Sequence, residues 1–122
     1  MEESILNTIK EMLGPSGDYE AFDIDLITNI NTYLGVLNQL GIGKPGFFIT
    51  DDNDTWDDFL TEQEAELGIT LNEVKTYLYL RVKMVFDPPT SSILAQAINE
   101  NIAELGWRLN TKVETGLQGK GE

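Results

Sequence analysis

The residues best suited to chemistry lie in the acidic segment DDNDTWDDFLTE, residues 51–62. The segment has the twelve-residue length of a calcium-binding EF-hand loop. The residues near ligand positions are Asp51, Asn53, Thr55 and Glu62. Its sixth position, however, is Trp56, where the turn of such a loop needs glycine. We therefore interpret the segment as a solvated acidic loop that leads into a capped helix, and we predict no metal ion and no other cofactor.

Other patterns that could support catalysis are weak. The sequence has no Cys and no His, which excludes thiol nucleophiles and the side chain best suited to proton transfer at neutral pH. The string GIGKPG at 41–46 lacks the spacing of a phosphate-binding loop, and we interpret it as a helix terminator. Asp57 and Asp58 are adjacent, so they point in different directions from a helix. The sequence predicts a protein that is not an enzyme.

The net charge of −13 is unevenly distributed along the chain. Residues 1–70 hold 15 acidic and two basic residues, whereas residues 71–122 hold six of each. The first part of the chain should therefore repel nucleic-acid phosphates rather than bind them. A dense acidic surface also allows a different function, that of a DNA-mimic inhibitor of a nucleic-acid-binding protein.

The beginning of the chain does not resemble a leader sequence. The segment MEESILNTIKEML has no basic region before an apolar block, and no apolar run reaches the length of about 18 residues that a membrane span requires. We expect a soluble protein that is made in the cytoplasm and does not contact a membrane.

Apolar residues spaced three and four apart predict an all-α fold, a small bundle of about four helices. The expected long helices are at about 3–13, 22–40 and 71–86, with a shorter one at 56–66 and a last long helix that is capped within 90–92 and carries apolar residues from Leu94 to Leu109. Residues 41–54 form a long loop, in which the β-prone run Phe47–Thr50 allows a short β-hairpin. The periodicity is lost after Asn110. We therefore expect a helical domain at 1–110 and a tail at 111–122 that stays flexible until a partner orders it.

Two helix starts and one sharp break are marked by specific residues. Thr55 with Asp58 and Thr70 with Glu73 fit capping boxes, in which each side chain bonds the backbone amide of the other residue. Two prolines follow Asp87 and cannot donate backbone hydrogen bonds, so the segment Asp87–Pro89 must end one helix and form an interhelical elbow.

Aromatic and basic residues surround the apolar stripe of the helix at 71–86. Tyr77, Tyr79 and Arg81 make this helix apolar or aromatic over most of its circumference. Either the helix lies at the centre of the fold, or its second face packs on another subunit. Trp107 and Arg108 pose the same question, because they lie off the main stripe of the last helix and suit either an interface or the core.

The block VKTYLYLRVKMVFDPPTSSILAQAINENIAELGWRLN, Val74–Asn110, resembles the C-terminal half of the small head-tail connector (adaptor) proteins of siphophages, the long-tailed double-stranded-DNA phages. The DPPTSS break and the terminal WRLN are the specific parts. Earlier blocks, LNQLGIG and TWDDF, are similar to the same family over nearly the whole chain.

The resemblance implies a structural virion protein of the phage neck. Such a protein forms a homo-oligomeric ring, a dodecamer, beneath the portal protein, joins the capsid to the tail and extends the channel used for genome ejection. Its expected partners are the portal protein and a stopper or tail-completion protein, and DNA passes without specific binding.

Expected roles can be assigned to five groups of residues. The subunit interface is predicted at Tyr77, Arg81, Trp107 and Arg108, and the elbow at Asp87, Pro88 and Pro89. By analogy with the family, the portal-binding tail comprises Asn110, Thr111, Lys112, Val113 and Leu117. The tail-side loop comprises Phe47, Phe48, Asp51, Asp52 and Trp56. The acids expected to line the channel are Asp54, Asp57, Asp58 and Glu62.

Overall fold

The computed structural model describes residues 3–14 and 20–120, with side chains described up to position 116. The helices are α1 (Ile5–Leu13), the 3-10 turn η2 (Glu20–Phe22), α2 (Asp23–Gln39), α3 (Trp56–Phe59), α4 (Glu62–Glu66), α5 (Leu71–Phe86) and α6 (Ser92–Lys120). The predicted all-α class is confirmed. Six α-helices form within the described residues. Four of them are the predicted long helices, and the predicted short helix at 56–66 forms as two, α3 and α4.

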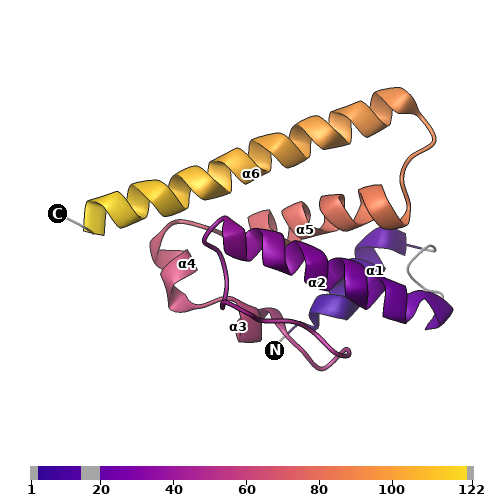
Figure 1. The fold of residues 1–122 in the computed structure, drawn as a ribbon, viewed down its shortest axis with the longest axis horizontal. Helices are drawn as coiled ribbons and strands as arrows, with labels where there is room; N and C mark the ends of the chain where they lie inside the picture. The colour runs from indigo at the N-terminus through magenta and orange to yellow at the C-terminus, as the bar shows by residue number, and fades with distance from the viewer. Residues whose placement is uncertain (1–2, 15–19, 121–122) are drawn as a thin grey trace.

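Helix α5 lies at the centre of the bundle. It contacts α1, α2 and α6, and Figure 1 shows it between α6 on one side and α1 and α2 on the other. Val74, Leu78 and Val82 are fully buried, and Tyr77 is nearly so. Three helices therefore remove water from α5 around most of its circumference, which favours the first of the two interpretations of its apolar surface.

Helix α6 continues to Lys120, although the spacing of apolar residues in the sequence is lost after Asn110. Leu109 and Val113 are buried and extend the apolar stripe by one more turn. Gly41, at φ 92°, leaves the space that Val113 fills, because a Cβ atom there would lie 2.7 Å from Val113 Cγ1. Packing on the end of α2 thus stabilises the last turns of α6, although glycine has a low helix propensity. Ordering of the tail on a portal stays a prediction.

The expected β-hairpin does not form among the described residues. Residues 47–50 adopt no strand, and the described bridge instead pairs Ser4 with Thr55. The backbone groups of Ile49 are satisfied by the Asn31 side chain, which accepts from its amide at 2.7 Å and donates to its carbonyl at 3.0 Å. A side-chain amide on α2 therefore takes the place of a partner strand.

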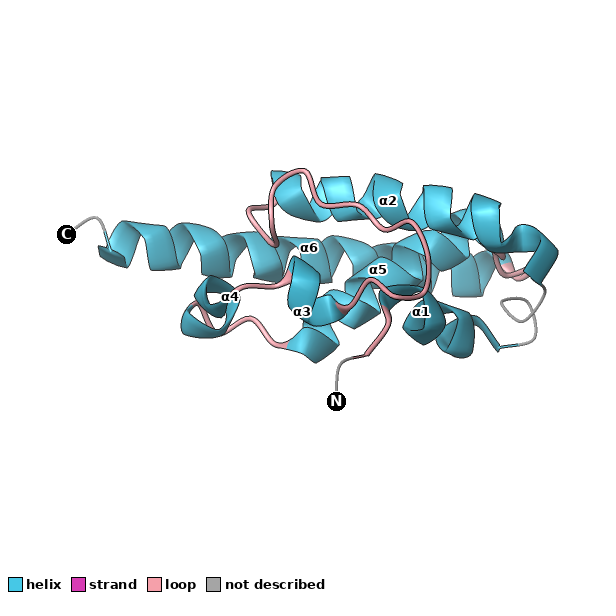
Figure 2. Ribbon diagram, turned by 90° about the horizontal axis from the view of Figure 1, so that it is seen from below, coloured by secondary structure: helices cyan, strands magenta, loops and turns pink. Residues whose placement is uncertain are grey.

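The helix expected at 56–66 is interrupted at Leu60 and Thr61. Thr61 starts α4 with a capping box of its own, in addition to the two predicted boxes, which both form. Its partner Glu64 is 5% exposed and also accepts a hydrogen bond from the Gly43 amide at 2.5 Å. Figure 2 shows α3 and α4 on the same side of the molecule as α1. One carboxylate therefore joins the loop after α2 to α4.

We predict that Glu64→Ala lowers the free energy of unfolding by about 2 kcal/mol, because it leaves the part-buried amides of Gly43 and Thr61 without their charged acceptor. Urea denaturation measures this change. The control is Glu62→Ala, since Glu62 is exposed on the same helix and its replacement should cost less than about 0.5 kcal/mol. Equal losses in both variants would contradict the prediction.

Candidate functional site

The acidic segment 51–62 serves local structure. The Asp54 carboxylate accepts from the Thr50 amide at 2.8 Å, and Asp58 closes the capping box at Thr55. Within the part of the chain that the structure describes, no group of three or more acidic, His or Cys residues is arranged to hold a metal ion. No described helix is long and apolar enough to cross a membrane.

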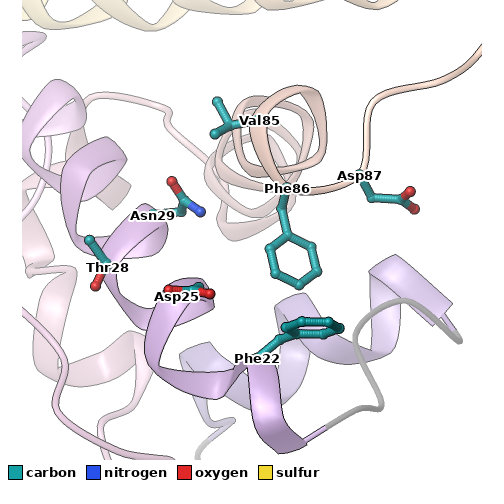
Figure 3. Close-up of a pocket in the computed structure, with 7 residues that line it drawn as sticks. All are labelled: Phe22, Asp25, Thr28, Asn29, Val85, Phe86 and Asp87. Carbon is teal, nitrogen blue, oxygen red and sulfur yellow. The ribbon is translucent and has the colours of Figure 1, made fainter.

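A groove lies at the end of the molecule where α5 turns toward α6. We call it the elbow groove, and its lining residues are Phe22, Asp25, Thr28, Asn29, Val85, Phe86 and Asp87 (Figure 3). Its volume is about 620 Å³. Such a volume falls in the range of roughly 300–1,000 Å³ that is typical of ligand sites. The groove is thus large enough for a side chain of another molecule.

Two aromatic rings form the floor of the elbow groove. Phe22, at the start of α2, packs edge-on against Phe86, at the end of α5, with 5.9 Å between the ring centroids. Figure 3 shows the two rings facing one another from their separate helices, with Asp25 beside them. Val85 is 54% exposed and Phe22 46%. The groove therefore combines exposed apolar surface with acidic side chains.

The elbow itself is held by the last turn of α5. The Asp87 amide donates to the Lys83 carbonyl, and Lys83 Nζ reaches the Asp87 carbonyl at 3.3 Å and its carboxylate at 3.7 Å. Pro88 and Pro89 follow outside any helix. The predicted break therefore occurs where the prolines require it.

Helix α6 presents large apolar side chains on its outer surface. Ile93 is 82% exposed, Leu94 51% and Trp107 68%. Beside Trp107, the Arg108 guanidinium pairs with Glu104 at 2.7 Å along the helix, and both side chains are more than half exposed. Trp107 and Arg108 thus lie on the surface, where an interface requires them.

Tyr77 and Arg81, which were predicted at the subunit interface, contact other residues of the same chain. Tyr77 is 2% exposed, and its ring packs beside Gly106 of α6. Arg81 donates from Nε to the Tyr77 hydroxyl at 3.1 Å, and its guanidinium lies over the rings of Tyr33 and Tyr77. Tyr77 is therefore part of the core of the chain, and Arg81 is largely engaged by neighbouring aromatic residues.

The residues assigned to the portal-binding tail pack on the chain itself. Asn110 donates to the Leu40 carbonyl at 3.4 Å, and Val113 is buried at the end of α2. Lys112 donates to Glu73 at 2.9 Å and to the Gly68 carbonyl at 2.9 Å. Thr111 is half-buried, and the Leu117 side chain lies outside the described residues. These contacts hold the second half of α6 against the body.

The residues of the tail-side loop divide into two groups. Phe48 is 61% exposed, and Asp51 and Asp52, three and four positions after it, are also exposed. Trp56 is 1% exposed and donates from Nε1 to the Thr8 hydroxyl at 3.1 Å, so it belongs to the core. Phe47 is half-buried and packs on Phe59. Only the first group can meet another protein without rearrangement.

The acids assigned to the channel are also of two kinds. Asp54 and Asp58 are engaged with backbone amides, as described above. Asp57 and Glu62 are exposed in the first turns of α3 and α4. Their charges therefore act on the surrounding solution and on any polyanion near this surface.

Glu73 links the start of α5 to the second half of α6. Burial alone would raise the pKa of its carboxyl, but the hydrogen bonds from Lys112 and Thr70, with the charge of Lys112, hold that pKa below its ordinary value. The carboxylate therefore closes the capping box of α5 and holds α6 at the same time.

The elbow groove was not anticipated from the sequence. Val85 follows the apolar spacing of Val74, Leu78 and Val82 on α5, which is typical of a core position, and Phe22 marks the start of a predicted helix. Phe22, and Ile24 with 79% exposure, could have indicated it, because both lie off the buried positions of α2 beside acidic residues.

Comparison with known proteins gives one match. A family model described as "Phage connector protein" matches residues 5–116. No curated protein and no solved structure matches the chain.

We predict that Glu73→Gln lowers the free energy of unfolding by about 1 kcal/mol at pH 7, because it removes the charge facing Lys112 while Gln can still serve in the capping box. A carboxyl whose pKa is lowered by folding stabilises the fold above its unfolded pKa, near 4.5. That stabilisation is lost as the pH falls through the lower pKa of the folded state.

Urea denaturation across a pH series measures this dependence. The difference between Glu73→Gln and the parent protein should shrink below pH 4.5 and vanish when the carboxyl is protonated in both states. Glu114→Gln, at an exposed position further along α6, serves as the control. A difference for Glu73→Gln that does not change with pH would refute the role assigned to the charge.

Proposed function

Because the chain belongs to the phage connector protein family, we propose that it is a structural subunit of the virion neck that forms a ring beneath the portal protein. In this role it joins the capsid to the tail and extends the channel through which the genome leaves. The family match carries the proposal, since it extends from the first residue of α1 to within a few residues of the end of α6.

The distribution of exposed apolar side chains supports self-assembly. The elbow groove and the outer surface of α6 are different surfaces of the same chain, and both expose large apolar groups. Contact between two different surfaces is heterologous, and a heterologous contact closes into a ring when its rotation permits. A small domain can leave such surfaces open because the ring covers them.

The channel is assigned to the acidic surface. Exposed Asp57 and Glu62 repel phosphates, so DNA would pass a ring of these side chains without being retained. Phe48, Asp51 and Asp52 are assigned to the stopper or tail-completion protein. The second half of α6 is assigned to the portal.

No catalytic role is proposed. The sequence supplies no Cys and no His. The described carboxylates cap helices, form salt bridges or face solvent. The chemistry of the described surface is therefore that of protein–protein contact.

Light scattering of the purified protein, alone and after mixing with the portal protein of the same virus, tests this function. We predict a particle that contains many copies of the 13.6 kDa chain, either alone or on the portal. A monomer indifferent to the portal would contradict the proposal. It would instead support the DNA-mimic inhibitor, for which the net charge of −13 is the argument.

A further inference from the structure

We propose that the elbow groove binds Trp107 and Arg108 of a second copy of this chain. This inference rests on the proposed ring and identifies which surfaces meet in it. The indole of Trp107 would lie on the rings of Phe22 and Phe86, and the Arg108 guanidinium would face Asp25.

The groove has the chemistry to receive these two side chains. Its floor is the edge-on pair of Phe22 and Phe86, and Val85 extends the apolar surface with 54% exposure. Aromatic groups favour offset or edge-on packing with other aromatic rings. Asp25 is exposed in the first turn of α2 and has no ion-pair partner among the described salt bridges. An aromatic residue beside a cation therefore complements the groove.

Trp107 and Arg108 have the properties of the matching element. Trp107 exposes 68% of its surface on a rigid helix, and Trp and Arg are the residues most enriched at the energetic centres of interfaces. Among the described residues, the ion-pair partner of Arg108 is Glu104, on the same helix, and both side chains are more than half exposed. Such a surface pair contributes little, so the guanidinium can turn to a new carboxylate at small cost.

Charge complementarity selects this segment over the other exposed apolar groups. Among the described residues, the exposed cations are Lys44 and Arg108. Lys44 lies between Gly43 and Pro45 in the loop after α2, and the exposed aromatic residue of that loop, Phe48, is four positions away from it. Ile93 and Leu94 of α6 are exposed but have no charge that could pair with Asp25. Arg108, next to Trp107, combines both properties that the groove requires.

The contact must join two molecules. Trp107 lies 15 positions beyond Ser92, the first residue of α6, and a helix rises about 1.5 Å per residue. Trp107 is therefore roughly 22 Å along α6 from the end of the helix near the elbow. Figure 1 shows α6 as a straight helix that runs away from that end, so it cannot bring Trp107 to its own groove. Each copy would offer one groove and one Trp107–Arg108 pair, which is a head-to-tail arrangement.

A charge swap tests the pairing of Arg108 with Asp25. Arg108→Glu and Asp25→Arg should each weaken assembly on the portal by about tenfold or more, measured by light scattering over a concentration series. The double variant Asp25→Arg with Arg108→Glu should recover most of that loss, because the pair is restored with its charges exchanged. Lys44→Glu is the matched control for charge, and it should assemble as the parent protein does. A double variant no better than the single ones would overturn the inference.

Cross-linking tests the geometry, and the absence of native cysteine makes it specific. Thr28→Cys labels the groove and Glu104→Cys labels α6 one turn from Arg108. With a short bismaleimide, the double variant should give a ladder of linked multimers on the portal, whereas each single variant should remain unlinked. Linked dimers of a single variant would show a symmetric contact instead, and would overturn the inference.

The two proposals can fail separately. If the parent protein assembles with the portal but neither the charge swap nor the ladder gives the expected result, the ring stands and the groove contact is wrong. If the parent protein does not assemble by light scattering, the proposed function fails and this inference fails with it.

Discussion

The burial of α5 by three other helices is the constraint on which the rest of the structure depends. Most of its apolar side chains face α1, α2 and α6, so the part of α5 left open to another subunit is mainly its C-terminal end, where Val85 and Phe86 line the elbow groove. Tyr77 and Arg81 are consequently engaged within the chain. The apolar surface left for contact with other proteins lies at the ends and on the outside of the helices that cover α5.

Local rules were sufficient where the chain itself carries the signal. Helix α5 begins at the capping box of Thr70 and Glu73 and ends before the prolines, as its sequence predicts. The rules failed where distant contacts decided. The Gly43 amide donates to the Glu64 carboxylate of α4, and Gly41 makes room for Val113, which extends α6 beyond its periodic residues. Neither contact can be recognised from spacing alone, because each joins residues whose proximity exists only in the folded chain.

The candidate site shows the same limit. Trp107 and Arg108 leave the apolar stripe of α6 in sequence, which allowed either an interface or a core position, and the structure places both on the surface. The elbow groove could not, since Phe22 and Val85 come from separate helices and are brought together by the packing of α2 on α5. Burial likewise removed Trp56 from the expected tail-side surface, because its indole reaches Thr8 on α1. Surface composition is readable from sequence, whereas the shape that two helices make together is not.

The chain belongs to the phage connector protein family and leaves two apolar surfaces open, the elbow groove and the outer surface of α6, which we propose meet between neighbouring copies. Electron cryo-microscopy of the chain assembled with its portal protein tests this claim most directly. We predict a closed ring coaxial with the portal, in which Trp107 of each copy occupies the elbow groove of its neighbour. Single copies attached to the side of the portal, or a ring that leaves both surfaces open to solvent, would contradict it.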